Sequence, residues 1–195
     1  MSSTTLHRLT ADEYLATERL AEGRSEFVDG VVRPMASSNH NHSMVLGGAM
    51  VALHQALRPL SQFVFAVNMR IETPYGMMAY PDVCVPARNS RYRDHEKDVL
   101  LTPELILEVY SPETERYDRS LRFERYQSIE SLQTYLLVSQ ESAAVDLFSR
   151  QPDGSWELTS YTAGTIEIPV PKCQIEMSDI YERVFENATS QPPPP

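Results

Sequence analysis

The sequence predicts a single domain of the α/β class, an α+β fold with a mixed sheet covered by helices, and two observations carry that prediction. One long helical pattern in residues 39–60 is followed by three strand patterns rich in Val, Ile and aromatic residues. A helical stretch then separates the third strand from a fourth, which is the crossover expected between parallel strands. The expected core order is therefore α-β-β-β-α-β.

A short helix and a hairpin are expected before this core. Thr10, followed by Glu13, gives a capping-box pattern at the start of "TADEYLATER". Asp29 and Gly30 form a turn signal between two short strands in "SEFVDGVVRPM". The N-terminal part should therefore be a helix-hairpin unit.

The core elements follow from periodicity. The long helix should end before Pro59, and the strands should lie in "QFVFAVNMRIETP", "AYPDVCVPA", "ELILEVYSP" and "LQTYLLVSQ". The crossover helix is expected in "SPETERYDRSLRFERYQSI". The apolar stripe of the long helix is expected to be Leu46, Ala49, Met50, Leu53 and Leu57.

A β-hairpin extension is expected after the core, turning at Pro152-Asp153-Gly154. A short strand in "IEIPV" and a short helix that starts at Ser178 should follow. Residues 1–186 are expected to form the single domain, and the proline-rich residues 187–195 a disordered tail.

Composition argues against several classes of function. The net charge of −10 weakens any general affinity for nucleic acid, because non-specific binding depends on neutralising phosphates. Cys84 and Cys173 form no Cys-x-x-Cys pair, so we expect two buried small side chains without redox or zinc chemistry. No stretch reaches the ~18 apolar residues of a membrane span, and no signal peptide opens the sequence. The expectation is a cytoplasmic protein without a membrane contact.

Basic residues gather in residues 88–97 and 116–125. These stretches are interpreted either as solvated faces with internal ion pairs or, for the second, as part of a functional surface.

A carboxylate lies in the middle of the third core strand, where an unpaired buried charge is costly. This residue, Glu108, has an expected neighbour in Asp82, which follows Pro81 and points the same way as Cys84 on the preceding strand. Two carboxylates near the same end of a sheet could hold one Mg²⁺ or Mn²⁺. Alternation places Glu104, Ile106, Glu108 and Tyr110 on one face, and Leu105, Leu107 and Val109 on the other.

Each carboxylate also has a structural interpretation. Asp82 after a proline is a common strand-entry device, and Glu108 could form a buried salt bridge with an arginine of the crossover helix. In that helix Asp118, Arg122 and Tyr126 fall at i, i+4 and i+8 and share a face. A cation there could orient a hydrolytic water or stabilise charge developing on a phosphate.

The segments "AYPDVCV", "PELILEVYSPET" and "DRSLRFERYQSIESLQTYLLV" together resemble a restriction endonuclease family that was once catalogued as a domain of unknown function and is abundant in cyanobacteria. It belongs to the PD-(D/E)XK nuclease superfamily. The similarity runs from about Leu9 to about Glu182. The resemblance implies a restriction-endonuclease-like core, with Asp82 in the PD element and Glu108 as the acidic member of the (D/E)XK element.

The resemblance also implies a substitution. Many superfamily members keep a lysine two residues after the glutamate, where this chain has Tyr110. The family is instead expected to carry its lysine on the following helix, in the pattern D-R-x-x-K-x-x-x-Y. The matching residues are Asp118, Arg119, Arg122 and Tyr126, so Arg122 takes the lysine position. Arginine keeps the charge but cannot release a proton, so impaired activity is one expectation.

Other residues have two interpretations each. Glu26 matches a family glutamate and either leans toward the metal or occupies a surface strand position. His42 matches a family histidine or is a satisfied core or cap residue. His40 and His42 form His-x-His without a third ligand nearby in sequence, and Lys97 is either a substitute lysine or a solvated loop residue.

The resemblance thus implies a Mg²⁺-dependent (or Mn²⁺-dependent) endonuclease acting on DNA. Asp82, Glu108 and Arg122 would be catalytic, Asp82 and Glu108 would bind the metal, and Glu26, His42, Asp118 and Tyr126 would support them. The first alternative is a catalytically inactive nuclease-like module that binds nucleic acid or a protein partner. The second is a purely structural ion-pair network. A homodimer is expected, because superfamily nucleases that cut both strands commonly dimerise.

Overall fold

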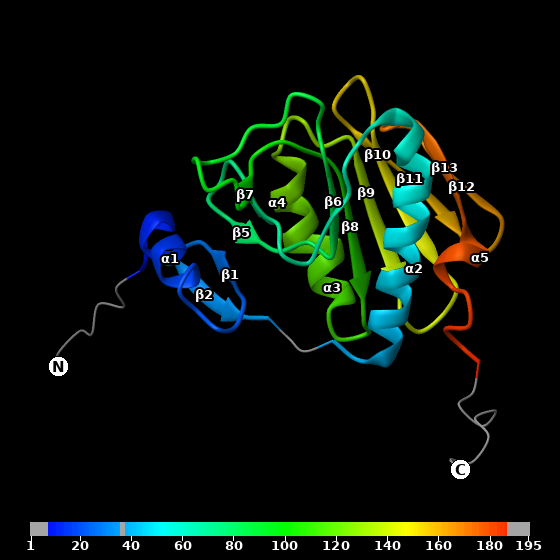
Figure 1. Cartoon of the computed structure of the whole chain (residues 1–195), viewed down its shortest axis with the longest axis horizontal. Helices are drawn as coiled ribbons and strands as arrows, with labels where there is room; N and C mark the ends of the chain where they lie inside the picture. The colour runs from blue at the N-terminus through cyan, green and yellow to red at the C-terminus, as the bar shows by residue number, and fades with distance from the viewer. Residues whose placement is uncertain (1–7, 36–37, 187–195) are drawn as a thin grey trace, which may run out of the picture.

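The computed structural model describes residues 8–35 and 38–186, and its centre is a six-stranded mixed sheet (Figure 1). β8 (Pro103–Tyr110) and β9 (Thr134–Ser139) are parallel neighbours, and the other adjacent strands pair antiparallel. The sheet confirms the predicted core order. Its strands are, in spatial order, β11 (Trp156–Tyr161), β10 (Val145–Arg150), β9, β8, β6 (Val83–Pro86) and β3 (Phe65–Ala66).

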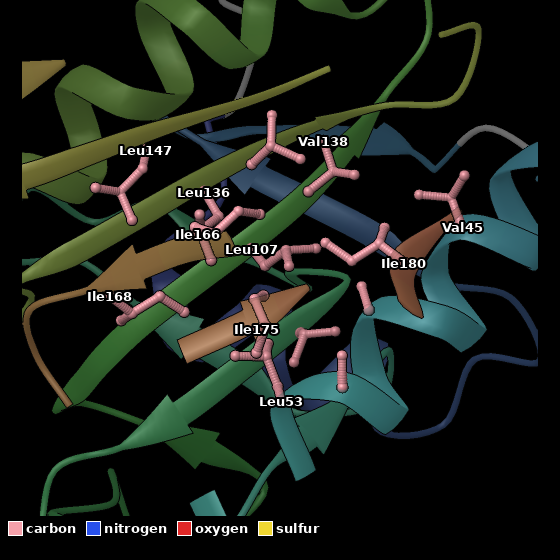
Figure 2. Packing of buried hydrophobic residues seen from close by; sticks show 14 of the residues in the cluster. Val45, Leu53, Leu107, Leu136, Val138, Leu147, Ile166, Ile168, Ile175 and Ile180 are labelled. Atoms are coloured by element: carbon pink, nitrogen blue, oxygen red, sulfur yellow. The ribbon is translucent and has the colours of Figure 1, made fainter. Parts of the chain in front are cut away.

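One face of this sheet carries the larger core. α2 (His40–Leu57) and α5 (Met177–Ile180) pack there, together with a two-stranded sheet of β12 (Thr165–Ile168) and β13 (Cys173–Glu176). Figure 2 shows Leu107 of β8 and Leu136 of β9 pointing toward these elements. Because strand side chains alternate, β8 sends its odd-numbered apolar residues into this core, as predicted.

The opposite face is covered by the crossover between β8 and β9. This segment is helical from Glu115 to Gln127 but contains a π-helical turn, a feature that is frequent at functional sites. Phe123 and Tyr126 bury their rings against Tyr135 of β9. The crossover consists of α3 (Glu115–Tyr117), the π-helical η2 (Asp118–Arg122) and α4 (Phe123–Gln127).

A second sheet of five strands lies beside the main one, and the sequence did not predict it. Two predicted strands, 62–74 and 79–87, each break and contribute to both sheets. The first breaks near Val67, whose φ is +45°, and the second near Pro81, which has no N–H to donate to a ladder. The second sheet has the order β2 (Val31–Pro34), β1 (Ser25–Val28), β5 (Met78–Ala79), β4 (Arg70–Glu72) and β7 (Val99–Leu100).

The N-terminal helix-hairpin unit is confirmed. Thr10 caps α1 (Ala11–Glu18) in a capping box with Glu13. Asp29 and Gly30 both have positive φ in the turn between β1 and β2, as a tight hairpin turn requires. Tyr14 of α1 stacks on Phe27 of β1, and both pack in one cluster with Met78 and Val99 of the second sheet, which attaches the unit to that sheet.

The buried stripe of α2 differs from the prediction. Val45 and Ala52 are buried in place of Leu46 and Met50, because the helix packs against α5 as well as the sheet. Contact with α5 falls at Gly48, where any Cβ would clash with the backbone of α5.

Several smaller predictions can be compared with the structure, and they agree only in part. α5 begins at Met177 rather than Ser178, and Cys173 is only half-buried, whereas Cys84 is buried as expected. The predicted tail at 187–195 lies outside the described residues. Among the helices of the described part, none is long and apolar enough to cross a membrane.

Candidate active site

One cleft with a volume of about 500 Å³ opens where the C-terminal end of β8 meets α2 and the crossover. Its lining includes six of the seven predicted site residues. The seventh, Tyr126, lies beneath the cleft and contacts one of the six. The six predicted residues in its lining are Glu26, His42, Asp82, Glu108, Asp118 and Arg122.

Asp82 lies immediately before β6 and is held from two sides. Its Oδ2 accepts a hydrogen bond of 2.8 Å from the backbone N–H of Val109, and its Oδ1 lies 3.2 Å from His42 Nε2. Burial lowers the pKa of His42, but the hydrogen bond and the charge of Asp82 outweigh it, so that this pKa is raised. The carboxylate of Asp82 therefore has a fixed orientation toward the cleft.

Glu108 lies on the neighbouring strand, as predicted from the alternation of β8. The backbone N–H of Asp82 donates to its Oε2 at 3.3 Å, so the carboxylate of Glu108 touches the backbone of Asp82. The hydroxyl of Tyr126 donates to Oε1 at 2.8 Å. Glu108 is only 2% exposed, and burial raises the pKa of its carboxyl against the opposing charge of Arg122.

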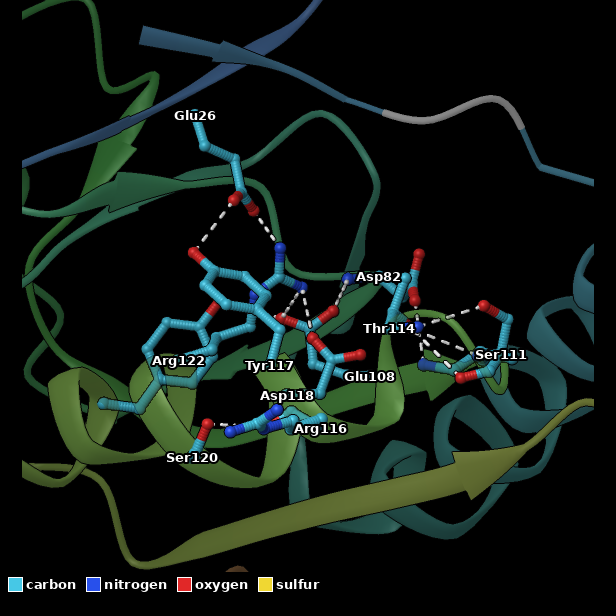
Figure 3. Close-up of polar contacts among 12 residues, drawn as sticks. Glu26, Asp82, Glu108, Ser111, Thr114, Arg116, Tyr117, Asp118, Ser120 and Arg122 are labelled. Carbon is cyan, nitrogen blue, oxygen red and sulfur yellow. Dashed lines mark hydrogen bonds and ion pairs between the residues drawn. The ribbon is translucent and has the colours of Figure 1, made fainter. Parts of the chain in front are cut away.

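Arg122 contacts carboxylates from three different elements (Figure 3). Its Nη1 lies 3.0 Å from Glu108 Oε1 and 3.3 Å from Asp118 Oδ1, and its Nη2 pairs with Glu26 Oε1. The interpretation of Glu108 as a partner in a buried salt bridge with an arginine of the crossover is thereby confirmed. A salt bridge does not exclude a second cation, because three acidic residues share this guanidinium.

Glu26 reaches the site from the second sheet. It lies on β1, is 6% exposed, and accepts a hydrogen bond from Tyr117 at 3.3 Å. Of its two sequence interpretations, the surface strand position is wrong. The helix-hairpin unit therefore contributes a buried carboxylate to the cleft.

The charge balance of the cluster fits a divalent cation. Glu26, Asp82, Glu108 and Asp118 bring four carboxylates to the cleft, and the guanidinium of Arg122 pairs with three of them, Glu26, Glu108 and Asp118. In residues 8–35 and 38–186, no group of three or more His, Cys, Asp or Glu side chains could hold a metal ion. Mg²⁺ in particular commonly uses one or two carboxylates and keeps several waters. The adjacent Asp82 and Glu108 satisfy that requirement.

Two other candidates lie away from the cleft. Lys97 is an exposed loop residue, as its solvated interpretation predicted, and His40 is exposed at the first turn of α2. Neither lines the cleft. Tyr110, at the position where the sequence resemblance implied a lysine in many related nucleases, contacts the guanidinium of Arg119.

Three arginines of the basic stretches form ion pairs outside the cluster, but their partners lie elsewhere in the chain and not within the stretches, as the interpretation of internal ion pairs had expected. Arg93 pairs with Glu72, Arg119 with Asp146 at 2.6 Å, and Arg125 with Asp29 at 2.8 Å.

The cleft lining also includes residues that the sequence analysis did not single out, among them Tyr117 and Arg33. Tyr117 directly precedes Asp118, the first residue of the i, i+4, i+8 pattern, and nothing in the local sequence distinguishes it from an ordinary helix residue. Arg33 had a signal, because a two-residue turn at Asp29-Gly30 places it directly opposite Glu26.

Comparison with known proteins gives a family and two relatives. The family model Uma2, described as "Putative restriction endonuclease", matches residues 11–178. "Uncharacterized protein sll1609" of Synechocystis sp. is 31% identical over 161 residues, which cover 82% of this chain and 91% of that protein. "Uncharacterized protein slr1290" of the same organism is 31% identical over 158 residues, 80% of this chain and 82% of that protein.

A solved structure has a similar fold. The crystal structure of "a putative nuclease belonging to DUF820" from Anabaena variabilis matches with a TM-score of 0.72. The match covers 91% of this chain and 99% of that chain at 16% sequence identity. At such low identity the similarity shows the fold, and it agrees with the predicted mixed α/β architecture.

Proposed function

This chain belongs to the Uma2 family, described as "Putative restriction endonuclease", and from that premise we propose that it is a metal-dependent nuclease that hydrolyses phosphodiester bonds in DNA. One observation carries the proposal. Asp82 directly precedes β6, its backbone N–H contacts the carboxylate of Glu108 on the neighbouring β8, and both residues line one cleft. Such paired carboxylates are the protein ligands that Mg²⁺ or Mn²⁺ would need.

Asp82 and Glu108 would hold the metal, which when bound supplies Lewis-acid chemistry and an activated water. The surrounding residues support this role because they fix both carboxylates. His42 and the N–H of Val109 orient Asp82, while Tyr126 orients Glu108. Groups held by their neighbours in this way need little rearrangement when a substrate binds.

We assign Arg122 a positioning role. Its guanidinium holds Glu108 and Glu26 in one place, and Asp118 in turn anchors the guanidinium. It also supplies positive charge beside the position where charge develops on the phosphate. Because arginine keeps its proton, transfer of a proton to the leaving oxygen would fall to water or to another group.

The alternative function is a catalytically inactive nuclease-like module that binds nucleic acid or a protein partner. The engagement of Arg122 favours it, since both of its Nη atoms are already occupied by carboxylates. A guanidinium held in this way has less freedom to follow a reacting phosphate than the ammonium of a lysine.

Incubation of the purified protein with supercoiled plasmid and Mg²⁺ or Mn²⁺ tests the proposal. We expect cleavage by the wild type and none by Asp82→Asn or Glu108→Gln. Glu124→Gln is the matched control, because Glu124 is an exposed glutamate of α4 outside the cleft. Absent cleavage, or cleavage that survives the first two changes, would reject the nuclease. Retained DNA affinity without Mn²⁺ binding would select the alternative.

Arg122→Lys separates the two functions further. A rise in cleavage would mean that the arginine limits catalysis.

Cutting both strands calls for two sites, so we extend the proposal to a homodimer. Light scattering in solution should then give twice the mass of one chain.

A further inference from the structure

Arg33 is a cation in the cleft wall that has no carboxylate partner within the described residues. Only two arginines line the cleft there, and the other, Arg122, is engaged by three carboxylates. Arg33 is exposed, and its guanidinium lies over the ring of Tyr117 at 6.0 Å from the centroid. Its positive charge is therefore available to a ligand.

Among the residues that the structure describes, Arg33 has no acidic partner because the carboxylate opposite it in the hairpin, Glu26, pairs with another arginine. The register of β1 and β2 places it directly opposite Glu26, so the two side chains lie on the same face of the sheet. Glu26 is buried and pairs with Arg122 instead. Arg122 therefore neutralises the charge of Glu26 on the buried side. Arg33 stays at the mouth of the cleft, where its guanidinium lies over the ring of Tyr117.

The electrostatics of the cleft define what Arg33 would bind. The lining carries the acidic residues described above and Glu113 as well, so it repels a phosphate backbone that approaches without a counter-charge. Arginine presents a planar fork of donors that suits phosphate oxygens. A nucleic acid entering this cleft would meet Arg33 as its first cation that is not paired with a carboxylate.

We propose that Arg33 binds a backbone phosphate of DNA beside the phosphodiester at the carboxylates, and so positions the nucleic acid in the cleft. The proposal rests on the proposed function, because it takes DNA as the substrate. It is distinct from the chemistry at Asp82 and Glu108, since a phosphate contact at the mouth needs no metal.

The test is the binding of a fluorescein-labelled DNA duplex, followed by polarisation in EDTA at several salt concentrations. Loss of one phosphate contact in Arg33→Ala should weaken binding by about 5- to 10-fold and make the slope of log K against log salt shallower by about 0.9. Arg33→Gln should give the same loss, and Arg33→Lys should keep the slope of the wild type.

Arg58→Ala is the matched control. Arg58 is also exposed, but it lies at the opposite end of α2 from the cleft. The Arg58→Ala variant should bind the duplex with the affinity of the wild type and with the same slope of log K against log salt. Thermal melts should show that all variants fold. The inference is overturned if Arg33→Ala and Arg33→Gln bind like Arg58→Ala, or if the wild type binds no DNA. Arg33-dependent binding without plasmid cleavage in Mg²⁺ or Mn²⁺ would keep this inference and reject the nuclease.

Discussion

Arg122 Nη1 lies 3.0 Å from Glu108 Oε1, so the residue at the family's expected lysine position is paired with the carboxylate in the middle of β8. The positive charge of Arg122 compensates the cost of burying the carboxylate of Glu108 in an apolar strand. It also connects the two parts of the molecule, because the same guanidinium holds Glu26 of the second sheet. Site geometry and fold stability therefore depend on one side chain.

Arg122→Ala should destabilise the protein strongly. The change leaves Glu26, Glu108 and Asp118 close together without a cation, and breaking a buried pair costs about 3–5 kcal/mol of unfolding free energy. Urea unfolding followed by circular dichroism measures the loss. Arg119→Ala is the control, because its ion pairs lie nearer the surface and should contribute only about 0–1 kcal/mol. Equal losses in the two variants would refute the central role of Arg122.

Tyr126→Phe should cost more stability than Tyr135→Phe. Both tyrosines are fully buried, but the hydroxyl of Tyr126 donates to the carboxylate of Glu108 whereas that of Tyr135 donates to a backbone carbonyl. A hydrogen bond to a charged group contributes about 1.5–3 kcal/mol, against about 0.5–1.5 kcal/mol for a neutral one. The free energies of unfolding at neutral pH give the comparison. A larger loss from Tyr135→Phe would show that Glu108 does not depend on this donor.

The attachment of α1 should weaken in acid. Arg19 is the C-cap residue of α1, and its hydrogen bond to Asp98 lowers the pKa of that carboxyl. Asp98 also contacts Arg70 of β4 at 2.8 Å and so links the end of α1 to the second sheet. A lowered carboxyl pKa stabilises the fold above the ordinary value of 3.8, and this contribution is lost as pH falls through the folded pKa. Asp98→Asn should therefore be less stable than wild type at neutral pH, and the difference should disappear in acid.

Unfolding free energies measured from neutral pH to about pH 2 test this prediction, because the range extends below the ordinary pKa of aspartate. Asp179→Asn, at an exposed position on α5, is the control and should differ little from wild type across the range. A stability difference for Asp98→Asn that persists at the lowest pH would mean that packing, and not the charge of Asp98, attaches α1.

The main sheet could be predicted because its signals are local. Alternation in β8 located both faces of the strand, and the spacing of Asp118, Arg122 and Tyr126 located one face of the crossover. The π-helical turn leaves Asp118 and Arg122 close enough to form an ion pair. Much of the cleft could therefore be assembled from spacing alone.

The second sheet could not be predicted, because its strands are two to four residues long and depend on partners distant in sequence. The break near Val67 has no glycine to mark it, and only the surrounding structure holds that residue at positive φ. For the same reason the buried position of Glu26 was not decided by sequence. It follows from how the β1–β2 hairpin docks beside the crossover.

Diffraction from a crystal soaked in Mn²⁺ tests the central claim most directly, because the anomalous signal of the metal shows where it binds. The account predicts one strong peak between the carboxylates of Asp82 and Glu108, with Arg122 still in contact with Glu108, and no peak in crystals of Asp82→Asn. A fully soaked wild-type crystal without density between those two side chains would contradict it.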